Sequence, residues 1–273
     1  MLADKLTFSI NTRCTLKCRH CIHYINHFSP ESRIDFPCER ILSDVDLACA
    51  AHDFIRIGVI QGGEPFLHPD FSRILLRLCS KSNVGMVQIF SNGICRISEE
   101  NFSALQNERV HVRISSYMGT GVLNQKQEAL LEKNLHRLQK AGVSHTLYRV
   151  AWNLAPTLRK REYSAEVLQR IKENCPCLPD SRLVVNGIYS PCHYAAYIAL
   201  HDLGDYAEDK VSLSPELPRE TLRRRIVEVN ERSYYQSCAH CDFSNEQVLP
   251  AEQGVDARYA HIRQMKLHHD VET

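Results

Sequence analysis

The amino-acid sequence predicts an α/β fold: a partial (β/α) barrel of five or six units, followed by a small second domain. Short apolar segments with strand character alternate with amphipathic helical segments through the first 155 residues. The connections between them are short, which favours a parallel sheet with right-handed crossovers. Cysteine-rich and glycine-rich segments directly follow predicted strands, at the sheet edge where such folds carry out their chemistry.

The first domain, residues 1–155, is expected to contain five strands, at residues 5–10, 54–60, 86–90, 109–115 and 145–152. Helices are expected between them, at residues 38–52, 70–81, 98–106 and 124–141. The last helix has the clearest signals, because Asn124 can cap its N-terminus and Gly142 can end it.

The second domain, residues 156–255, follows a different pattern. Helices are expected at residues 162–174 and 218–235, and a compact hairpin at residues 183–190. The hairpin contains an Asn-Gly pair, which favours a type I′ turn. Residues 256–273 are expected to form a flexible tail.

The composition excludes several classes of protein. Lys and Arg number 33 and Asp and Glu 32, so net charge gives no reason to expect nucleic acid or membrane as a partner. The N-terminal segment lacks the apolar core of a signal peptide, and no apolar run approaches the roughly 18–20 residues that span a bilayer. We therefore expect a cytoplasmic protein.

Twelve cysteines in such a protein require an explanation. In a reducing compartment, clustered thiols are more often metal ligands or catalytic groups than disulfides. Isolated cysteines are better interpreted as small buried hydrophobes, and four belong to this class: Cys38, Cys49, Cys79 and Cys95. The others fall into an N-terminal and a C-terminal group.

The N-terminal group is Cys14, Cys18 and Cys21, in the loop expected after the first strand. Zinc is one candidate ligand, with His20 or His23 as a fourth donor. An iron–sulfur cluster is the better candidate, because three thiolates bind three irons and leave the fourth iron open.

This C-x3-C-x2-C loop, followed by "GGEP" after the second strand, resembles the signature of the radical S-adenosylmethionine (SAM) superfamily. The resemblance covers residues 5–152 and implies a partial TIM-like barrel. It further implies that Cys14, Cys18 and Cys21 bind a 4Fe–4S cluster whose open iron chelates SAM. Cleavage of SAM then yields a 5′-deoxyadenosyl radical that abstracts hydrogen from substrate.

The resemblance also implies SAM-binding roles for seven residues: His20, Gly62, Gly63, Glu64, Asn92, Ser115 and Arg149. The two glycines allow the backbone to approach the cofactor closely. Glu64 can accept a charge-assisted hydrogen bond from the methionyl ammonium. Most relatives carry an aromatic residue where this chain has His20, which can still stack on adenine.

The C-terminal group comprises Cys192, Cys238, Cys241 and either Cys175 or Cys177. Its spacing resembles the twitch domain, a short relative of the SPASM domain, and implies a second 4Fe–4S cluster. A zinc site is the alternative. Four thiolates saturate a cluster, which suits electron transfer rather than substrate binding.

A saturated second cluster suggests a reaction that must dispose of an electron. The layout is similar to that of the radical SAM aminocyclitol (2-deoxy-scyllo-inosamine) dehydrogenases. We therefore expect an oxidoreductase that oxidises a carbinol of a small cyclitol or sugar, supplied with electrons by a flavodoxin or ferredoxin. A peptide-modifying radical SAM enzyme is the alternative, and a structural zinc-binding protein is a more distant one.

Overall fold

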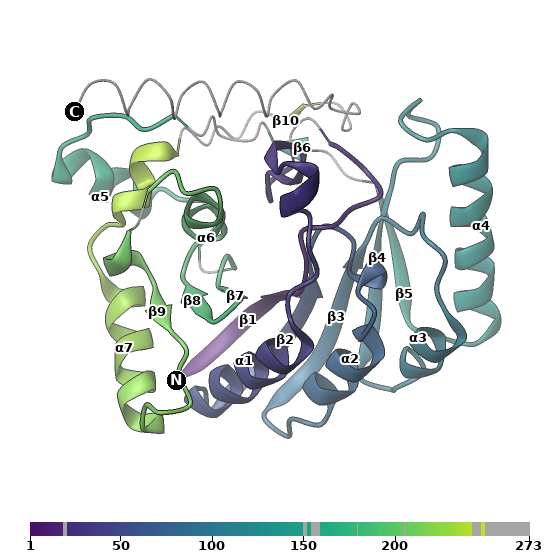
Figure 1. Cartoon of the computed structure of the whole chain (residues 1–273), viewed down its shortest axis with the longest axis horizontal. Helices are drawn as coiled ribbons and strands as arrows, with labels where there is room; N and C mark the ends of the chain where they lie inside the picture. Colours follow the sequence, from purple (N-terminus) through teal and green to yellow (C-terminus); the bar gives the residue numbers. More distant parts are fainter. Residues whose placement is uncertain are drawn as a thin grey trace.

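The computed structural model describes residues 1–18, 21–149, 152–153, 159–178, 180–204, 206–241 and 247–248. Its main element is an eight-stranded sheet with the strand order β5-β4-β3-β2-β1-β7-β8-β9. Figure 1 shows β1 in the middle of the molecule, with β2–β5 on one side and β7–β9 on the other. The sheet is not closed, so the fold is the partial barrel that the sequence predicts.

The parallel half of the sheet agrees with the five predicted strands. Its strands are β1 (Leu2–Ser9), β2 (Phe54–Gln61), β3 (Val84–Ser91), β4 (Val110–Ser116) and β5 (His145–Arg149). Each strand pairs in parallel with the next. A separate two-stranded ladder joins β6 (Trp152–Asn153) to β10 (Gln247–Val248).

Helices connect the parallel strands, as the short spacing predicts. They are α1 (Cys38–Ala51), α2 (Phe71–Cys79), α3 (Glu99–Ala104) and α4 (Gln125–Lys140). A capping box between Asn124 and Gln127 begins α4, and Gly142 follows its end with a φ of 66°. The buried faces of these helices and the apolar strand residues form one hydrophobic core.

The hairpin of β7 (Leu183–Val185) and β8 (Ile188–Ser190) forms as predicted. Asn186 and Gly187 both have positive φ, at 43° and 88°, as a type I′ turn requires. β7 also pairs in parallel with β1, so the hairpin extends the main sheet. Asp44 on α1 accepts a 2.8 Å hydrogen bond from the Gly187 amide and anchors the turn.

The other elements surround this hairpin. They are α5 (Ala165–Glu173), α6 (His193–Leu200), β9 (Val211–Ser212) and α7 (Arg219–Glu231). Short 3₁₀ helices occur at Ile25–His27, Pro30–Ser32, Pro65–Leu67, Ala207–Asp209 and Gln236–His240. The sequence pattern predicts α5 and α7 but not α6.

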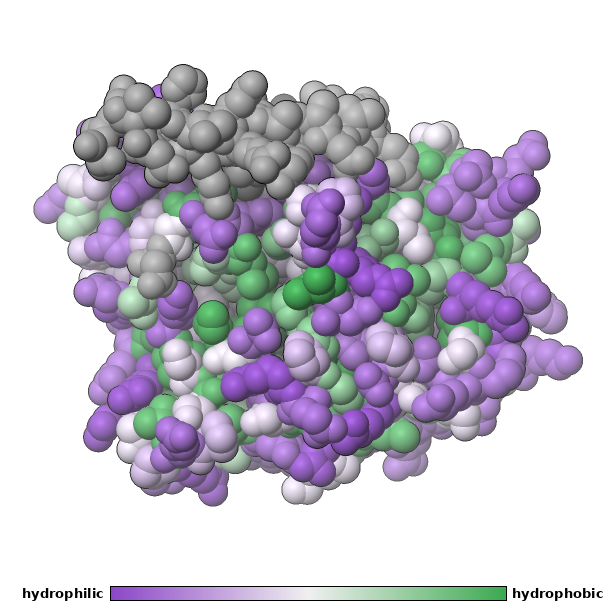
Figure 2. All heavy atoms as spheres, viewed as in Figure 1, coloured by the Kyte–Doolittle hydropathy of each residue, from purple (hydrophilic) through white to green (hydrophobic). Residues whose placement is uncertain are grey.

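The face of the molecule seen in Figure 2 is largely hydrophilic. Figure 2 shows polar residues over most of the viewed face, with apolar residues in scattered patches. Among the described residues, no helix combines the length and the apolar character needed to cross a bilayer. The predicted tail at residues 256–273 lies outside the described residues.

Candidate functional site

Cys14, Cys18 and Cys21 lie in the loop that follows β1, at the carboxyl end of the strand. Cys18 is buried and the other two are partly buried. Burial raises the pKa of Cys14 well above its usual range, and the nearby Cys21 and Cys18 sulfurs raise it further. Burial also raises the pKa of Cys21, and that of Cys18 to about 12. Buried thiols ionise when cations bind beside them, so three soft sulfur donors at one place fit iron. His20 lies outside the described residues.

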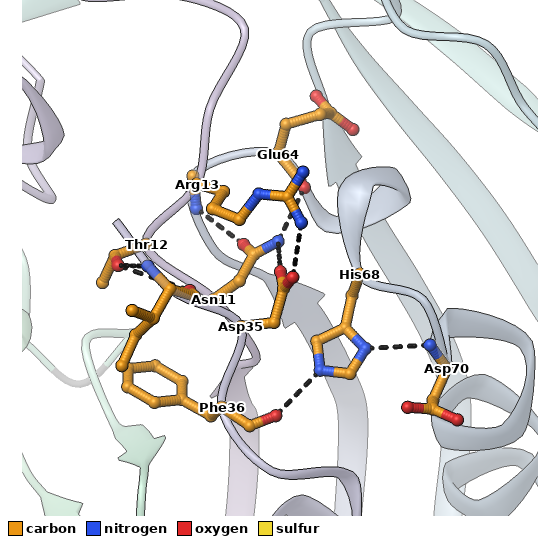
Figure 3. Close-up of polar contacts among 10 residues, drawn as sticks. Asn11, Thr12, Arg13, Asp35, Phe36, Glu64, His68 and Asp70 are labelled. Carbon is orange, nitrogen blue, oxygen red and sulfur yellow. Dashed lines mark hydrogen bonds and ion pairs between the residues drawn. The ribbon is translucent and has the colours of Figure 1, made fainter. Parts of the chain in front are cut away.

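The Gly-Gly-Glu segment after β2 packs directly on the residues that precede Cys14, and Figure 3 shows Glu64 beside Asn11 and Arg13. The Gly63 amide donates to the backbone and side-chain oxygens of Asn11, both at 3.1 Å. The Glu64 amide donates to Arg13 O at 2.7 Å. A Cβ added to Gly62 would lie 2.1 Å from Asn11 Oδ1, and one added to Gly63 would lie 2.1 Å from Arg13 O. Glycine is therefore required at both positions by close backbone approach.

Asn11 and Asp35 complete the contact between the two loops. Asn11 Nδ2 donates to Glu64 O at 3.0 Å and to Asp35 Oδ1 at 3.3 Å. Arg13 Nη1 donates to Asp35 Oδ2 at 2.5 Å, so one carboxylate supports both residues before the first cysteine (Figure 3). The sequence motifs identify neither Asn11 nor Asp35. The signal available for Asn11 is a polar residue at a strand end, three positions before a cysteine.

The Glu64 carboxylate is fully buried and points towards the end of β3. Its Oε1 accepts from Ser91 Oγ at 2.8 Å and from the Phe66 amide at 3.3 Å, and its Oε2 accepts from the Asn92 amide at 2.8 Å. Burial raises the pKa of Glu64 to about 7, although these three hydrogen bonds oppose the rise. The Cys95 thiol is a further hydrogen-bond partner of this carboxylate. A cation beside the carboxylate would favour its ionised form.

Asn92 links the end of β3 to the cysteine loop. Its Nδ2 donates to Thr15 Oγ1 at 3.0 Å and contacts Cys14 Sγ at 3.7 Å. Ser115 and Arg149 lie near the carboxyl ends of the neighbouring strands β4 and β5. The structure therefore places the predicted residues at or just after the carboxyl ends of five parallel strands, β1 to β5, along one edge of the sheet. Only the backbone position of Arg149 is described.

The C-terminal cysteines also come together. Cys175 and Cys177 follow α5, Cys192 precedes α6, and Cys238 and Cys241 lie in or beside the 3₁₀ helix at Gln236–His240. Burial raises the pKa of the Cys192 thiol, and three neighbouring thiols raise it further: Cys238, Cys241 and Cys175. The Cys177 thiol donates to the Cys175 sulfur and lowers the pKa of Cys175. Both candidates for the first position thus belong to the group.

Four cysteines lie outside these two groups, and one of them, Cys95, hydrogen-bonds to Glu64. Cys49, Cys79 and Cys95 are buried, as predicted. Cys38 is only partly buried, because it begins α1 at the surface, where Arg73 Nη1 lies 3.7 Å from its sulfur. Within the described part of the chain, no three His, Cys, Asp or Glu side chains are arranged to hold a single metal ion.

Aromatic residues of α6 lie between the two cysteine groups. The His23 ring stacks on Tyr197 with ring centroids 5.0 Å apart, and Tyr24 lies 5.9 Å from Tyr194. His23 Nδ1 also bonds to Gly62 O at 3.0 Å, and burial lowers the pKa of His23 to about 4. His23 therefore serves as a neutral donor to the glycine segment.

The chain resembles several known proteins in part of its sequence or in its fold. The chain is 32% identical over 97 residues to GTP 3′,8-cyclase of Lactiplantibacillus plantarum. The aligned segment covers 34% of this chain and 27% of the cyclase. The chain thus spans about a quarter of the length of that relative. The structure of anSMEcpe with bound AdoMet and Cp18Cys peptide superimposes with a TM-score of 0.56, at 12% identity, over 99% of this chain and 100% of that one. BtrN in complex with AdoMet and 2-DOIA gives a TM-score of 0.48, at 13% identity, over 91% and 98% of the two chains.

The family itself is established by the sequence of the barrel. The model of the Radical SAM superfamily matches residues 8–150, which is 143 of the 273 residues. This range contains the cysteine loop after β1, the Gly-Gly-Glu segment after β2 and the strand ends of β3–β5. The chain belongs to the Radical SAM superfamily.

Proposed function

We propose that the protein is a radical SAM oxidoreductase that oxidises a carbinol of a small polar substrate, a cyclitol or a sugar. The observation that carries this proposal is the gathering of five C-terminal thiols into a group distinct from Cys14, Cys18 and Cys21. A group of this size can saturate a second cluster, which then has no iron free for substrate. Accepting an electron is the simplest task left for it.

The first site would hold a 4Fe–4S cluster on its three thiols and SAM on the open iron. When bound, these supply the radical that removes a hydrogen atom from a carbon of the substrate. The chain's own residues would position SAM. Gly62 and Gly63 let the Glu64 segment pack directly on the cysteine loop, Glu64 offers a carboxylate oxygen to the ammonium of SAM, and Asn92 holds the loop that carries Cys14. His20, Ser115 and Arg149 are proposed as further contacts to SAM.

The second site would complete the oxidation. A carbinol carbon that has lost a hydrogen atom becomes a ketone by losing one proton and one electron. A cluster on Cys192, Cys238, Cys241 and either Cys175 or Cys177 would accept that electron. An external donor, a flavodoxin or ferredoxin, would supply the electron consumed in SAM cleavage. We propose a cytoplasmic location for this chemistry.

Replacing Cys14, Cys18 and Cys21 together with Ala tests the first site. We expect the variant to lose the formation of 5′-deoxyadenosine and to retain the iron and sulfide of the second site. The matched control is Cys49→Ala, which changes a buried thiol on α1 and should keep both. Near-stoichiometric zinc without sulfide in the wild type would refute the proposal.

Cys238→Ala tests the role of the second site. If its cluster accepts the electron, deuterium should still pass from substrate to 5′-deoxyadenosine while the ketone product falls sharply. Simultaneous loss of both would contradict electron acceptance. The substrate panel should contain deuterated cyclitols and sugars, with GTP included because the curated relative is a GTP cyclase. Deuterium transfer from a peptide and from none of these small molecules would replace the proposed reaction with peptide modification.

A further inference from the structure

The parallel strands present two chemically different faces. One face carries apolar core residues such as Ile89, Val112 and Ile114, which are fully or almost fully buried. Because side chains alternate along a strand, the intervening residues share the opposite face. We call this the polar face. On β3–β5 it is formed by Gln88, Phe90, His111, Arg113, Ser115 and Tyr148.

Helix α6 covers the polar face over β1 and β2. The Tyr197 hydroxyl lies 2.9 Å from Ser9 Oγ, and His193 Nε2 lies 3.0 Å from Gln61 Nε2. Over β3–β5 the same face is more open, because Phe90, Arg113 and Ser115 are only partly buried. Tyr148 is 42% exposed. The polar face is therefore accessible beneath the edge that carries the SAM-binding residues.

Among the described residues, Arg113 is the arginine of the polar face on β3–β5, and no described acceptor binds its guanidinium. Its guanidinium lies 5.1 Å from the ring centre of Phe90 and 4.1 Å from that of Tyr148. These cation–π contacts fix the plane of the guanidinium and leave its N–H edge free. Within the described residues, no hydrogen bond or ion pair engages that edge. The neighbouring His111 differs, since Ser144 and Thr146 hydroxyls bind both of its ring nitrogens at 2.9 Å.

A second arginine in the fold provides a comparison. Arg137 on α4 also lies over an aromatic ring, 4.3 Å from the centre of Phe102. Its guanidinium, however, donates to Ile97 O at 3.0 Å and to Glu99 at 2.8 Å. Stacking on an aromatic ring is therefore compatible with internal acceptors. Arg113 also stacks on aromatic rings, but no acceptor among the described residues binds its guanidinium.

Within the described strands, the charge of Arg113 has no acidic partner. The strand pairings of β1–β5 place no Asp or Glu among the residues that share its face. Asp180 reaches this side of the sheet, but it pairs with Lys5 on β1 at 2.9 Å. Gln88 adds an amide that also has no partner among the described residues. A partly buried guanidinium with a free planar edge is suited to bidentate binding of an oxyanion.

We propose that Arg113 binds an oxyanion group of the substrate, a carboxylate or a phosphate. This inference rests on the proposed function, because it assigns the substrate to the barrel face below the SAM-binding edge. Arg113 lies two residues before Ser115 on β4, which corresponds to roughly 7 Å along the strand. The substrate would thus carry its anionic group about one pleat deeper than the carbon that reacts.

Site-resolved protection of arginines tests this proposal on the wild-type, cluster-reconstituted protein. Methylglyoxal modifies accessible guanidinium groups, and mass spectrometry of peptides gives the rate at each arginine. The probes are inorganic pyrophosphate and succinate, with sodium chloride at equal ionic strength as the reference. We expect modification of Arg113 to slow about tenfold when the probe is about ten times above its Kd. Arg137 is the matched control, and its rate should not change.

The outcomes separate clearly. Protection by pyrophosphate alone identifies a phosphate-bearing substrate, protection by succinate alone identifies a carboxylate, and protection by both supports the shared chemistry. No protection beyond sodium chloride, or an Arg113 that methylglyoxal never reaches, overturns the proposal. SAM cleavage is measured on the same samples. Arg113 protection in a protein that does not cleave SAM would refute the proposed function while leaving the oxyanion site intact.

Discussion

Gly63→Ala should damage both the stability of the protein and its binding of SAM. The added Cβ would lie 2.1 Å from Arg13 O and 2.5 Å from Arg13 C, whereas ordinary contact begins at 3.4 Å. One of the two loops must therefore move by about 1.3 Å, which is the difference between the 3.4 Å of ordinary contact and the 2.1 Å to Arg13 O. The obstacle is backbone rather than a flexible side chain, so the strain cannot be relieved by a rotamer change.

The size of the effect follows from the bonds that this movement breaks. The Gly63 amide would lose its two acceptors on Asn11, and the Glu64 amide would move away from Arg13 O. Each such bond contributes about 1 kcal/mol, so the free energy of unfolding should fall by about 3 kcal/mol. One of the two loops carries Cys14 and the other carries Glu64, so movement of either should raise the Kd for SAM at least about tenfold, which is about 1.4 kcal/mol.

Anaerobic urea unfolding and SAM binding to the reconstituted protein measure these two effects. Gly142→Ala is the matched control, because Gly142 has a φ of 66° with nothing within 4 Å of an added Cβ. That variant should lose roughly 1–2 kcal/mol through its left-handed backbone and bind SAM normally. The reasoning is wrong if Gly63→Ala loses no more stability than Gly142→Ala and binds SAM like the wild type.

Two further predictions concern residues away from the site. Burial lowers the pKa of His52 to about 4 from 6.5, so the unfolded chain takes up a proton first as the pH falls. Stability should therefore decrease from pH 6.5 towards pH 4 by about 3 kcal/mol in total. His52→Gln should lack this component, and a constant difference from the wild type between pH 7.5 and pH 5 would contradict it. Asn134→Ala should cost about 2 kcal/mol in urea unfolding, because Asn134 Nδ2 donates at 2.8 Å to both Gly93 O and Cys95 O. The exposed Lys133→Ala on the same helix should stay within about 0.5 kcal/mol, and equal losses would refute the assignment.

The parallel half of the fold is predictable because its signals are local. Strands β1–β5 are short apolar runs, and α4 begins and ends at the capping residues that its sequence shows. Helix α6 is missed because its residues are apolar or aromatic on nearly every side, so no polar face reveals a helical period. Its position in the structure explains this pattern, since Tyr194, Tyr197 and Ile198 are all buried.

The site is predictable in its residue types and not in its contacts. Three cysteines and a Gly-Gly-Glu segment identify the family, and their place after strand ends puts them on one edge. The direction of the Glu64 carboxylate depends on Ser91 and Asn92, which come from a different strand end. The support of the cysteine loop by Asn11 and Asp35 likewise depends on residues 24 positions apart. Such contacts arise from tertiary packing, for which the sequence has no periodic signal.

The pairing of β7 with β1 has a consequence for synthesis of the chain on the ribosome. Thr7 is opposite Leu183 in the register, so one edge of β1 stays unpaired until β7 is synthesised, 176 residues later. At about 5–20 residues per second this interval lasts roughly 9–35 s. Throughout it the nascent sheet exposes an unpaired parallel edge, to which another nascent chain can add a strand. Expression yield should therefore depend on translation speed and chaperone supply more strongly than the stability of the finished protein suggests.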